Sequence, residues 1–169
     1  MLVRVRFAPA VVLVLLTGCG YKWQDYSCLE GRFTCRMPGK VKTETKSVYF
    51  PGGTLTMEAH GVEVSNGAFM VAYVKLPSKK TPFDYSACVK AMVNTWQGEV
   101  IYSKRGPVVE GISGVEFEAR IKWPKKGFAA GQVFIANKRV YMLLVMGSNF
   151  RADSKDVQEF WKSFKLLDK

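Results

Sequence analysis

Histidine is almost absent from this chain, and the motifs of several common enzyme classes are missing. The 169 residues contain one histidine, His60, which disfavours a multi-histidine metal site or a histidine-dependent proton relay. The sequence has no P-loop, no dinucleotide-binding glycine fingerprint, no H-E-x-x-H motif and no EF-hand loop. The stretch 111–114 lacks the final spacing of a G-x-S-x-G elbow and precedes an expected strand instead of a helix. We therefore assign no catalytic residue, no metal ligand and no cofactor.

Long hydrophobic runs are also lacking. The longest, residues 7–16, is about half of the ~20 apolar residues that a membrane-spanning helix needs. Arg4 and Arg6 precede this run without any acidic residue, and small residues follow it. A basic start, a short apolar core and small residues at the end are typical of a secretory signal peptide, which we place at residues 1–18.

The end of this signal carries a more specific pattern. Leu16-Thr17-Gly18-Cys19 resembles the lipobox of bacterial lipoproteins, in which the cysteine becomes the acylated N-terminus. The resemblance implies that Cys19 is lipidated and that the protein is anchored in the bacterial cell envelope, facing the periplasm or the exterior. Several acyl chains would hold it firmly, since each buried CH₂ contributes about 0.8 kcal/mol. Gly20 follows the cysteine in place of Asp, which in enteric-type sorting favours the outer membrane.

Residues 19–30 are expected to form the lipidated cysteine and a short tether. This segment contains three aromatic residues, Tyr21, Trp23 and Tyr26. Their rings could anchor at headgroup depth, where amphipathic aromatics are favoured. Packing back onto the folded domain is the interpretation that we prefer.

Positive charge is the main functional lead. Without Arg4 and Arg6, the chain keeps 23 basic and 14 acidic side chains, a net charge of +9. Pairs of basic residues are expected at strand ends and turns, where they could form one rim that meets anionic lipid, a cell-wall polymer or an envelope protein. Solvated loop lysines are the alternative, and nucleic acid is disfavoured by the compartment. The candidate positions are Lys79, Lys80, Lys104, Arg105, Lys125, Lys126, Lys138 and Arg139.

Three cysteines remain for the folded part, and no C-x-x-C motif occurs. An exported compartment permits disulfides, but three thiols leave one unpaired. Cys28 and Cys35 could pair across a turn at Leu29-Glu30-Gly31. Cys88 lies on the apolar face of an expected helix and could instead pair with either, although a buried, unreactive thiol is the preferred interpretation.

Glycine and proline divide the middle of the chain into segments that resemble strands. The segment 32–37 alternates apolar and polar residues, and 41–50 is a polar, lysine-containing strand that suits a sheet edge. Further strands are expected at 54–62, 67–76, 100–104, 108–110 and 114–123. The clearest hairpin joins 132–136 to 140–146, whose second arm is apolar on both faces. Such a strand belongs inside a sheet that is covered on both sides.

Two helices are expected to cover that sheet. The first follows Thr81 as N-cap, spans about 82–97 and carries apolar residues at three- and four-residue spacing. The second begins after Asp153 or Ser154 and places four apolar residues on one face, Val157, Phe160, Trp161 and Phe164. The prediction is an α+β fold, an α/β/α sandwich with a mainly antiparallel central sheet.

The order of these segments resembles PsbP-like and DcrB-like domains. The similar stretches are 31–40, which matches their opening strand, 114–117 and 131–143, which match a strand and hairpin, and 160–166, which matches the closing helix and strand. The resemblance covers residues 31–169 and implies the same sandwich. It also implies a scaffold that binds other macromolecules, and it transfers no active-site residue.

The sequence thus favours a lipid-anchored, non-catalytic binding or scaffolding domain of the envelope. The alternative is an envelope enzyme that uses Glu116 and Glu118, two carboxylates on one face of a strand. That face of an alternating strand is more often solvent-exposed, with Arg120 and Lys122 as expected neighbours across the sheet.

Overall fold

Two antiparallel sheets and two helices form the part of the chain that this computed structural model describes, residues 21–50, 53–78, 83–122 and 124–167. The large sheet has the order β3-β4-β5-β9-β8-β7-β6. Its strands are β3 (Lys42–Phe50), β4 (Gly53–Val64), β5 (Gly67–Lys75), β9 (Arg139–Gly147), β8 (Gly127–Ala136), β7 (Ile112–Ile121) and β6 (Glu99–Val109). The small sheet has the order β1-β2-β10 and contains β1 (Gln24–Cys28), β2 (Phe33–Met37) and β10 (Lys165–Leu166).

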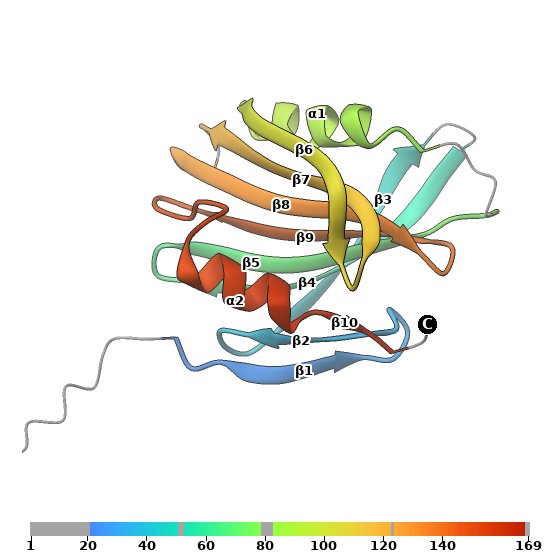
Figure 1. Ribbon diagram of the computed structural model, residues 1–169, viewed down its shortest axis with the longest axis horizontal. Coiled ribbons are helices and arrows are strands. Elements are labelled where there is room, and N and C mark those ends of the chain that lie inside the picture. Colours follow the sequence, from blue (N-terminus) through green and yellow to red (C-terminus); the bar gives the residue numbers. More distant parts are fainter. Residues whose placement is uncertain (1–20, 51–52, 79–82, 123, 168–169) are drawn as a thin grey trace, which may run out of the picture.

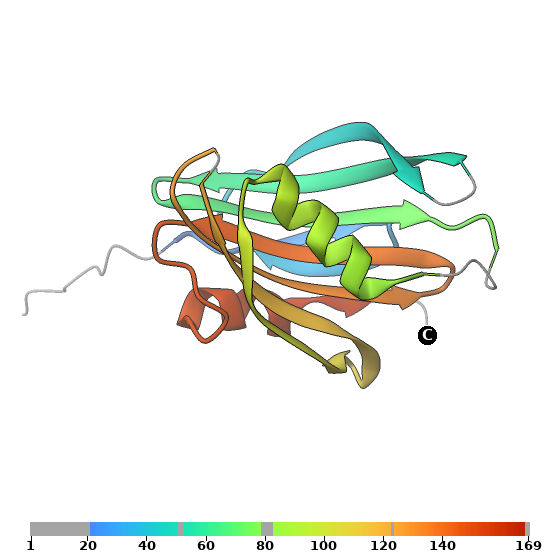
Figure 2. The same ribbon diagram turned by 90° about the horizontal axis from the view of Figure 1, so that it is seen from above.

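The two faces of the large sheet are covered by different layers. Helix α1 (Tyr85–Thr95) packs on one face, and helix α2 (Lys155–Ser163) lies on the other beside the small sheet (Figure 1). The view from above shows α1 crossing one face of the large sheet (Figure 2). The expected α+β fold with a mainly antiparallel sheet is confirmed, although a sheet and a helix together form the second covering layer.

Strand β9 lies in the middle of the large sheet, as its apolar sequence predicts. Residues from Val140 to Val145 are all buried, and they alternate between the two cores on either side of the sheet. The turn from β8 to β9 places Asn137 and Lys138 at φ values of 48° and 59°. Positive φ at both central residues is typical of a two-residue type I′ hairpin, which matches the twist of the strands.

The helices begin close to the expected positions. Helix α1 starts after Asp84, whose carboxylate accepts hydrogen bonds from the backbone N–H of Ser86 and Ala87. The expected cap Thr81 lies outside the described residues. Helix α2 starts after Ser154, and its Val157, Phe160 and Trp161 are buried, so its predicted apolar face is confirmed. Neither helix has the length and apolar character required to cross a bilayer, within the described part of the chain.

The folded unit begins earlier than residue 31. Strand β1 pairs with β2, and Tyr26 lies opposite Cys35 in this register. Tyr21 and Trp23 each form an edge-on contact with the buried ring of Phe69. Packing of these aromatics onto the domain follows the preferred interpretation, and most of the segment expected to be a tether belongs to the fold.

The two edge strands differ in how they match the sequence. The polar strand β3 occupies one edge of the large sheet, as predicted. At the other edge, the expected strands 100–104 and 108–110 form the single strand β6, with register irregularities between Val100 and Tyr102 and between Pro107 and Val109. Such irregularities are a common means of protecting an exposed edge from pairing with another chain.

Candidate functional site

A cleft of about 370 Å³ opens between the edge of the large sheet and the start of α2. It is lined by residues of β6, β7 and the loop and helix that follow β9: Ile101, Tyr102, Glu116, Glu118, Arg151, Ala152, Asp153 and Gln158. Ile101 and Tyr102 have 39% and 43% of their surface exposed. The cleft therefore combines exposed apolar surface with three carboxylates and one guanidinium.

Glu118 is buried at the base of this cleft, with 6% of its surface exposed. Its carboxylate forms an ion pair with Arg151 and accepts a hydrogen bond of 3.0 Å from the backbone N–H of Ala152. The guanidinium of Arg151 also lies 4.5 Å from the ring centroid of Phe128. These contacts hold the loop before α2 against the sheet, because a buried carboxylate is stable only when it is paired and hydrogen-bonded.

Glu116 is less constrained than Glu118. It is half-buried and accepts a hydrogen bond of 3.1 Å from Gln132 Nε2 on the neighbouring strand β8. The expectation that both glutamates lie on a solvent-exposed face is wrong for Glu118, because the loop before α2 covers that end of the strand. Its cationic partner is Arg151 instead of the expected Arg120 or Lys122, because the covering loop places the Arg151 guanidinium against the buried carboxylate.

The expected basic positions do not form one rim. Lys125 and Lys126 occupy the turn from β7 to β8, whereas Lys138 and Arg139 lie at the other end of β8. Lys104 and Arg105 lie within β6 opposite Glu116 and Val115, not at a strand end. Antiparallel pairing sends successive turns to opposite ends of the sheet, which explains the separation. Lys79 and Lys80 lie outside the described residues.

Two of these arginines are engaged with the domain itself. The guanidinium of Arg139 donates hydrogen bonds to the backbone carbonyls of Glu30 and Asn137, at 3.2 and 3.3 Å. Arg105 lies 5.5 Å from the ring centroid of Tyr85 at the start of α1. Lys104, Lys125, Lys126 and Lys138 are exposed, so they are the described candidates best placed to meet an anionic partner.

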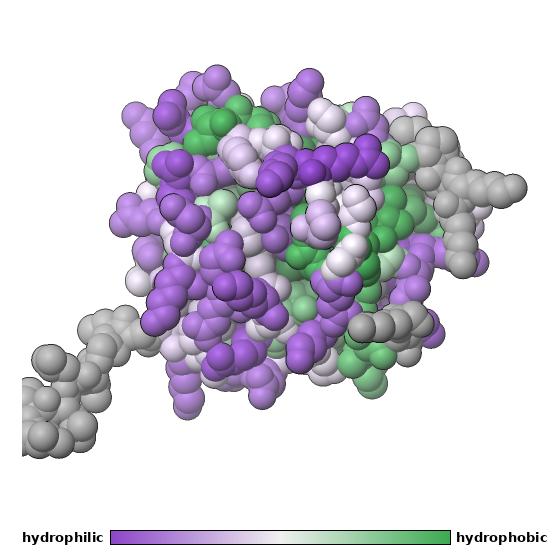
Figure 3. Space-filling model, in the orientation of Figure 1, coloured by the Kyte–Doolittle hydropathy of each residue, from purple (hydrophilic) through white to green (hydrophobic). Residues whose placement is uncertain are grey.

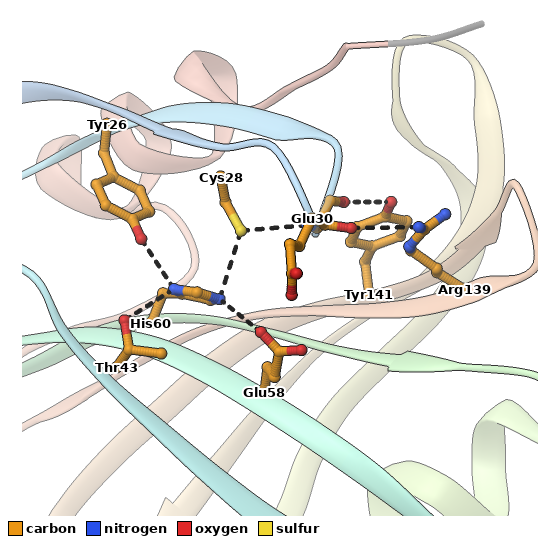
Figure 4. Close-up of polar contacts among 9 residues, drawn as sticks. Tyr26, Cys28, Glu30, Thr43, Glu58, His60, Arg139 and Tyr141 are labelled. Carbon is orange, nitrogen blue, oxygen red and sulfur yellow. Dashed lines mark hydrogen bonds and ion pairs between the residues drawn. The ribbon is translucent and has the colours of Figure 1, made fainter.

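A buried polar cluster lies beneath the small sheet, and sequence reasoning did not identify it (Figure 4). His60 of β4 is 3% exposed, and its Nδ1 lies 2.9 Å from the hydroxyl of Tyr26 and 3.2 Å from that of Thr43. Its Nε2 lies 3.6 Å from Cys28 Sγ and 4.0 Å from a carboxylate oxygen of Glu58. A single histidine in the sequence gave no signal of these partners, because Tyr26 and Cys28 belong to β1 and Thr43 belongs to β3, whereas only Glu58 shares the strand of His60.

Burial controls the ionisation of this cluster. It lowers the pKa of His60 below its usual value, and the nearby Glu58 carboxylate partly offsets that effect. Burial also raises the pKa of the Cys28 thiol. This effect outweighs the hydrogen bond of 3.2 Å that the sulfur accepts from the Gly31 N–H, which lowers the pKa. Both groups are thereby favoured in their neutral forms, as expected for polar groups that connect layers of a core.

The expected pairing of Cys28 with Cys35 is not formed. Both are free, buried thiols, and Cys88 is a free, half-buried thiol. The predicted turn between Cys28 and Cys35 is present, but in its register Cys28 lies opposite Phe33 and Cys35 lies opposite Tyr26. The two cysteines are therefore diagonal neighbours, about 7–8 Å apart, which exceeds the usual span of a disulfide between Cα atoms. Across the described ranges, no group of three or more His, Cys, Asp or Glu side chains could hold a metal ion.

The solution structure of cyanobacterial PsbP (CyanoP) from Synechocystis sp. PCC 6803 has a similar fold. The similarity covers 89% of this chain and 95% of that chain, with a TM-score of 0.58 and 12% sequence identity. The chain matches no protein-family signature and no curated protein sequence. The expected PsbP-like fold is confirmed, and the similarity concerns the fold alone.

Proposed function

We propose that this protein is a lipid-anchored domain of the bacterial cell envelope that binds another envelope component without catalysis. The observation that carries the proposal is the start of the folded unit, two residues after the lipobox cysteine Cys19. Tyr21 and Trp23 pack on Phe69, so the domain begins directly at the proposed anchor. A chain spans at most about 3.6 Å per residue, which holds Tyr21 within about 7 Å of the lipidated residue.

The PsbP-like fold is consistent with a binding or scaffolding role. The cleft beside α2 is the surface that we assign to the partner, because Ile101 and Tyr102 supply exposed apolar area next to Glu116 and Asp153. A partner segment with an apolar side chain and a neighbouring cation would match both features. Aromatic and apolar anchors surrounded by polar groups are typical of recognition surfaces.

The alternative of an envelope enzyme using Glu116 and Glu118 has less support. A general acid or base must be free to exchange a proton with a substrate. Both oxygens of Glu118 are engaged, one by Arg151 and one by the Ala152 N–H. Glu118 is thus better explained as the residue that fixes the wall of the cleft.

Anchoring is tested by fractionating cells that produce the protein or the Cys19→Ala variant. The wild type is expected in the membrane fraction after a high-salt wash and to incorporate labelled palmitate. The variant is expected to incorporate none and to become soluble. Palmitate incorporation without Cys19, or a variant that still pellets after the salt wash, would contradict the anchor.

Partner binding is tested by in-cell crosslinking from the cleft. A photoreactive amino acid at Tyr102 is expected to capture a defined envelope protein. The matched control is the same amino acid at Tyr49, which is 85% exposed on the opposite edge strand β3. Equal capture of the same protein from both positions, or no capture from Tyr102, would contradict the assignment of the cleft.

A further inference from the structure

One end of the large sheet is built from three turns that contact one another in a row. Ser148, after β9, donates its backbone N–H to the carbonyl of Asn66 in the β4–β5 turn, at 3.1 Å. A Cβ atom on Gly147 would meet that same carbonyl at 2.2 Å, and one on Gly127 would meet the Gly147 carbonyl at 2.3 Å. Glycine at these positions lets the backbones approach closely. The β4–β5, β9–α2 and β7–β8 turns thus form one continuous end of the sheet.

The start of the folded chain lies at this same end. The hydroxyl of Tyr21 donates a hydrogen bond to Asn66 Oδ1, and its ring contacts Phe69 just after the β4–β5 turn. Figure 1 shows β1 beginning on the side where β4 and β5 are joined. We call this surface the anchored end and define it by Tyr21, Asn66, Ser148 and the turn residues 124–126.

The anchored end carries a group of exposed cations on the β7–β8 hairpin. Arg120 and Lys122 lie at the end of β7, and Lys125 and Lys126 occupy the turn. Lys22 is also exposed, next to Tyr21. Four carboxylates lie nearby. Burial raises the pKa of Tyr21, and Asp156 lies close enough to raise it further. A carboxylate oxygen of Glu63 lies 3.9 Å from Lys42 Nζ. Asp153 lines the cleft, and Glu99 lies opposite Arg120 in the β6–β7 register. Hydrophilic side chains dominate the surface over α2 and on the side where β1 begins (Figure 3).

We propose that the anchored end faces the membrane and that Lys125 and Lys126 contact anionic phospholipid headgroups. This inference rests on the proposed lipid anchor at Cys19. Charges separated from a surface by more than about 8–10 Å are largely screened at physiological ionic strength. The short reach from Cys19 to Tyr21 puts the start of the domain at the proposed membrane surface, and the β7–β8 turn lies at the same end of the sheet, whereas Lys75 and Lys138 lie at the opposite end. The position of the anchor therefore decides which basic turn acts on lipid.

The test measures lysine accessibility in the purified, lipidated mature protein reconstituted in vesicles. A membrane-impermeant, amine-reactive reagent labels the outer surface, and the labelled peptides are quantified by mass spectrometry. Vesicles of phosphatidylcholine alone are compared with vesicles that also contain phosphatidylglycerol. Labelling of Lys125 and Lys126 is expected to fall by about fivefold per lysine on the anionic vesicles and to recover at high salt. Lys138 is expected to be labelled equally on both.

Two charge-reversal variants complete the test. The neighbouring Lys122 is expected to show the same salt-sensitive protection in the wild type. In Lys125→Glu/Lys126→Glu this protection of Lys122 is expected to disappear, while the protein remains on the vesicles through its acyl chains. The matched control Lys75→Glu/Lys138→Glu changes the same charge at the other end and is expected to keep that protection. Equal labelling of Lys125 and Lys138 on anionic vesicles would overturn the inference. Failure of the wild type to associate with any vesicle would instead overturn the anchor.

Discussion

The carboxylate of Glu118 in β7 forms an ion pair with Arg151, 33 residues later in the chain, across the base of the cleft. The buried glutamate and the half-exposed arginine thereby connect the large sheet to the loop before α2. The cleft beside α2 exists because this loop is held in place, and the stability of the loop can be measured separately from any binding activity.

The first prediction concerns this ion pair. Glu118→Gln is expected to lower the free energy of unfolding by about 1–3 kcal/mol, less than for a fully buried pair because Arg151 is half-exposed. Urea denaturation followed by circular dichroism measures the change. The control is Glu116→Gln, which keeps an acceptor for Gln132 Nε2 and is expected to cost less than about 1 kcal/mol. An equal loss in both variants would show that the Arg151 contact does not stabilise the domain.

The second prediction concerns the hydrogen bond between Tyr141 and the β1–β2 turn. The hydroxyl of Tyr141 donates to the backbone carbonyl of Gly31 at 2.8 Å, in a buried position between the large and small sheets. Tyr141→Phe leaves that carbonyl with one partner fewer and is expected to destabilise the domain by about 1–3 kcal/mol. Thermal and urea unfolding report the loss. Tyr102→Phe, on the exposed edge strand, is the control and is expected to change stability by less than about 0.5 kcal/mol.

The third prediction concerns pH. Burial lowers the pKa of His60 in the folded state below the unfolded value of about 6.5. The unfolded state therefore binds more protons between these two values, and the free energy of unfolding must fall as the pH is lowered through that window. The contribution of His60 is fully present above about pH 6.5. Urea denaturation from pH 7.5 down to pH 5 measures this dependence.

The control for the pH prediction is His60→Asn, which keeps a polar atom near the position of Nδ1 but does not titrate. The stability of this variant is expected to fall less steeply than that of the wild type over the same pH range. Parallel slopes for the two proteins would show that His60 is not buried in its neutral form.

The fourth prediction concerns the thiols. Burial raises the pKa of Cys35 to about 12 and that of Cys88 to about 11, so the reactive thiolate is scarce at neutral pH. Alkylation of the native, purified protein at pH 8 is expected to be slow at Cys28, Cys35 and Cys88, and rapid at all three in urea. Mass spectrometry without a reducing agent reads out both states. A peptide that contains Cys28 linked to Cys35 would contradict the free thiols of the structure.

Local pattern was sufficient for several elements of the fold. Period-two alternation from Phe33 to Met37 and the continuous apolar run from Val140 to Val145 each identify a strand and the number of its buried faces, because side-chain direction follows from backbone geometry. The spacing of Val157, Phe160 and Trp161 identifies the face of α2 for the same reason. Strand order, the separate small sheet and the strand β1, which was expected to be part of a tether, did not follow from local pattern, because long-range packing selects the pairing partners.

Tertiary structure alone decided where the functional groups meet. The positive charge and the scarcity of histidine are properties of the sequence, but antiparallel pairing places Lys125 and Lys138 at opposite ends of the sheet. His60 acquires Tyr26, Thr43 and Cys28 as neighbours, and Glu118 acquires Arg151, only because distant segments cover the same strands. Local propensity determines which face of a strand is apolar, whereas long-range packing determines which polar groups are desolvated and paired.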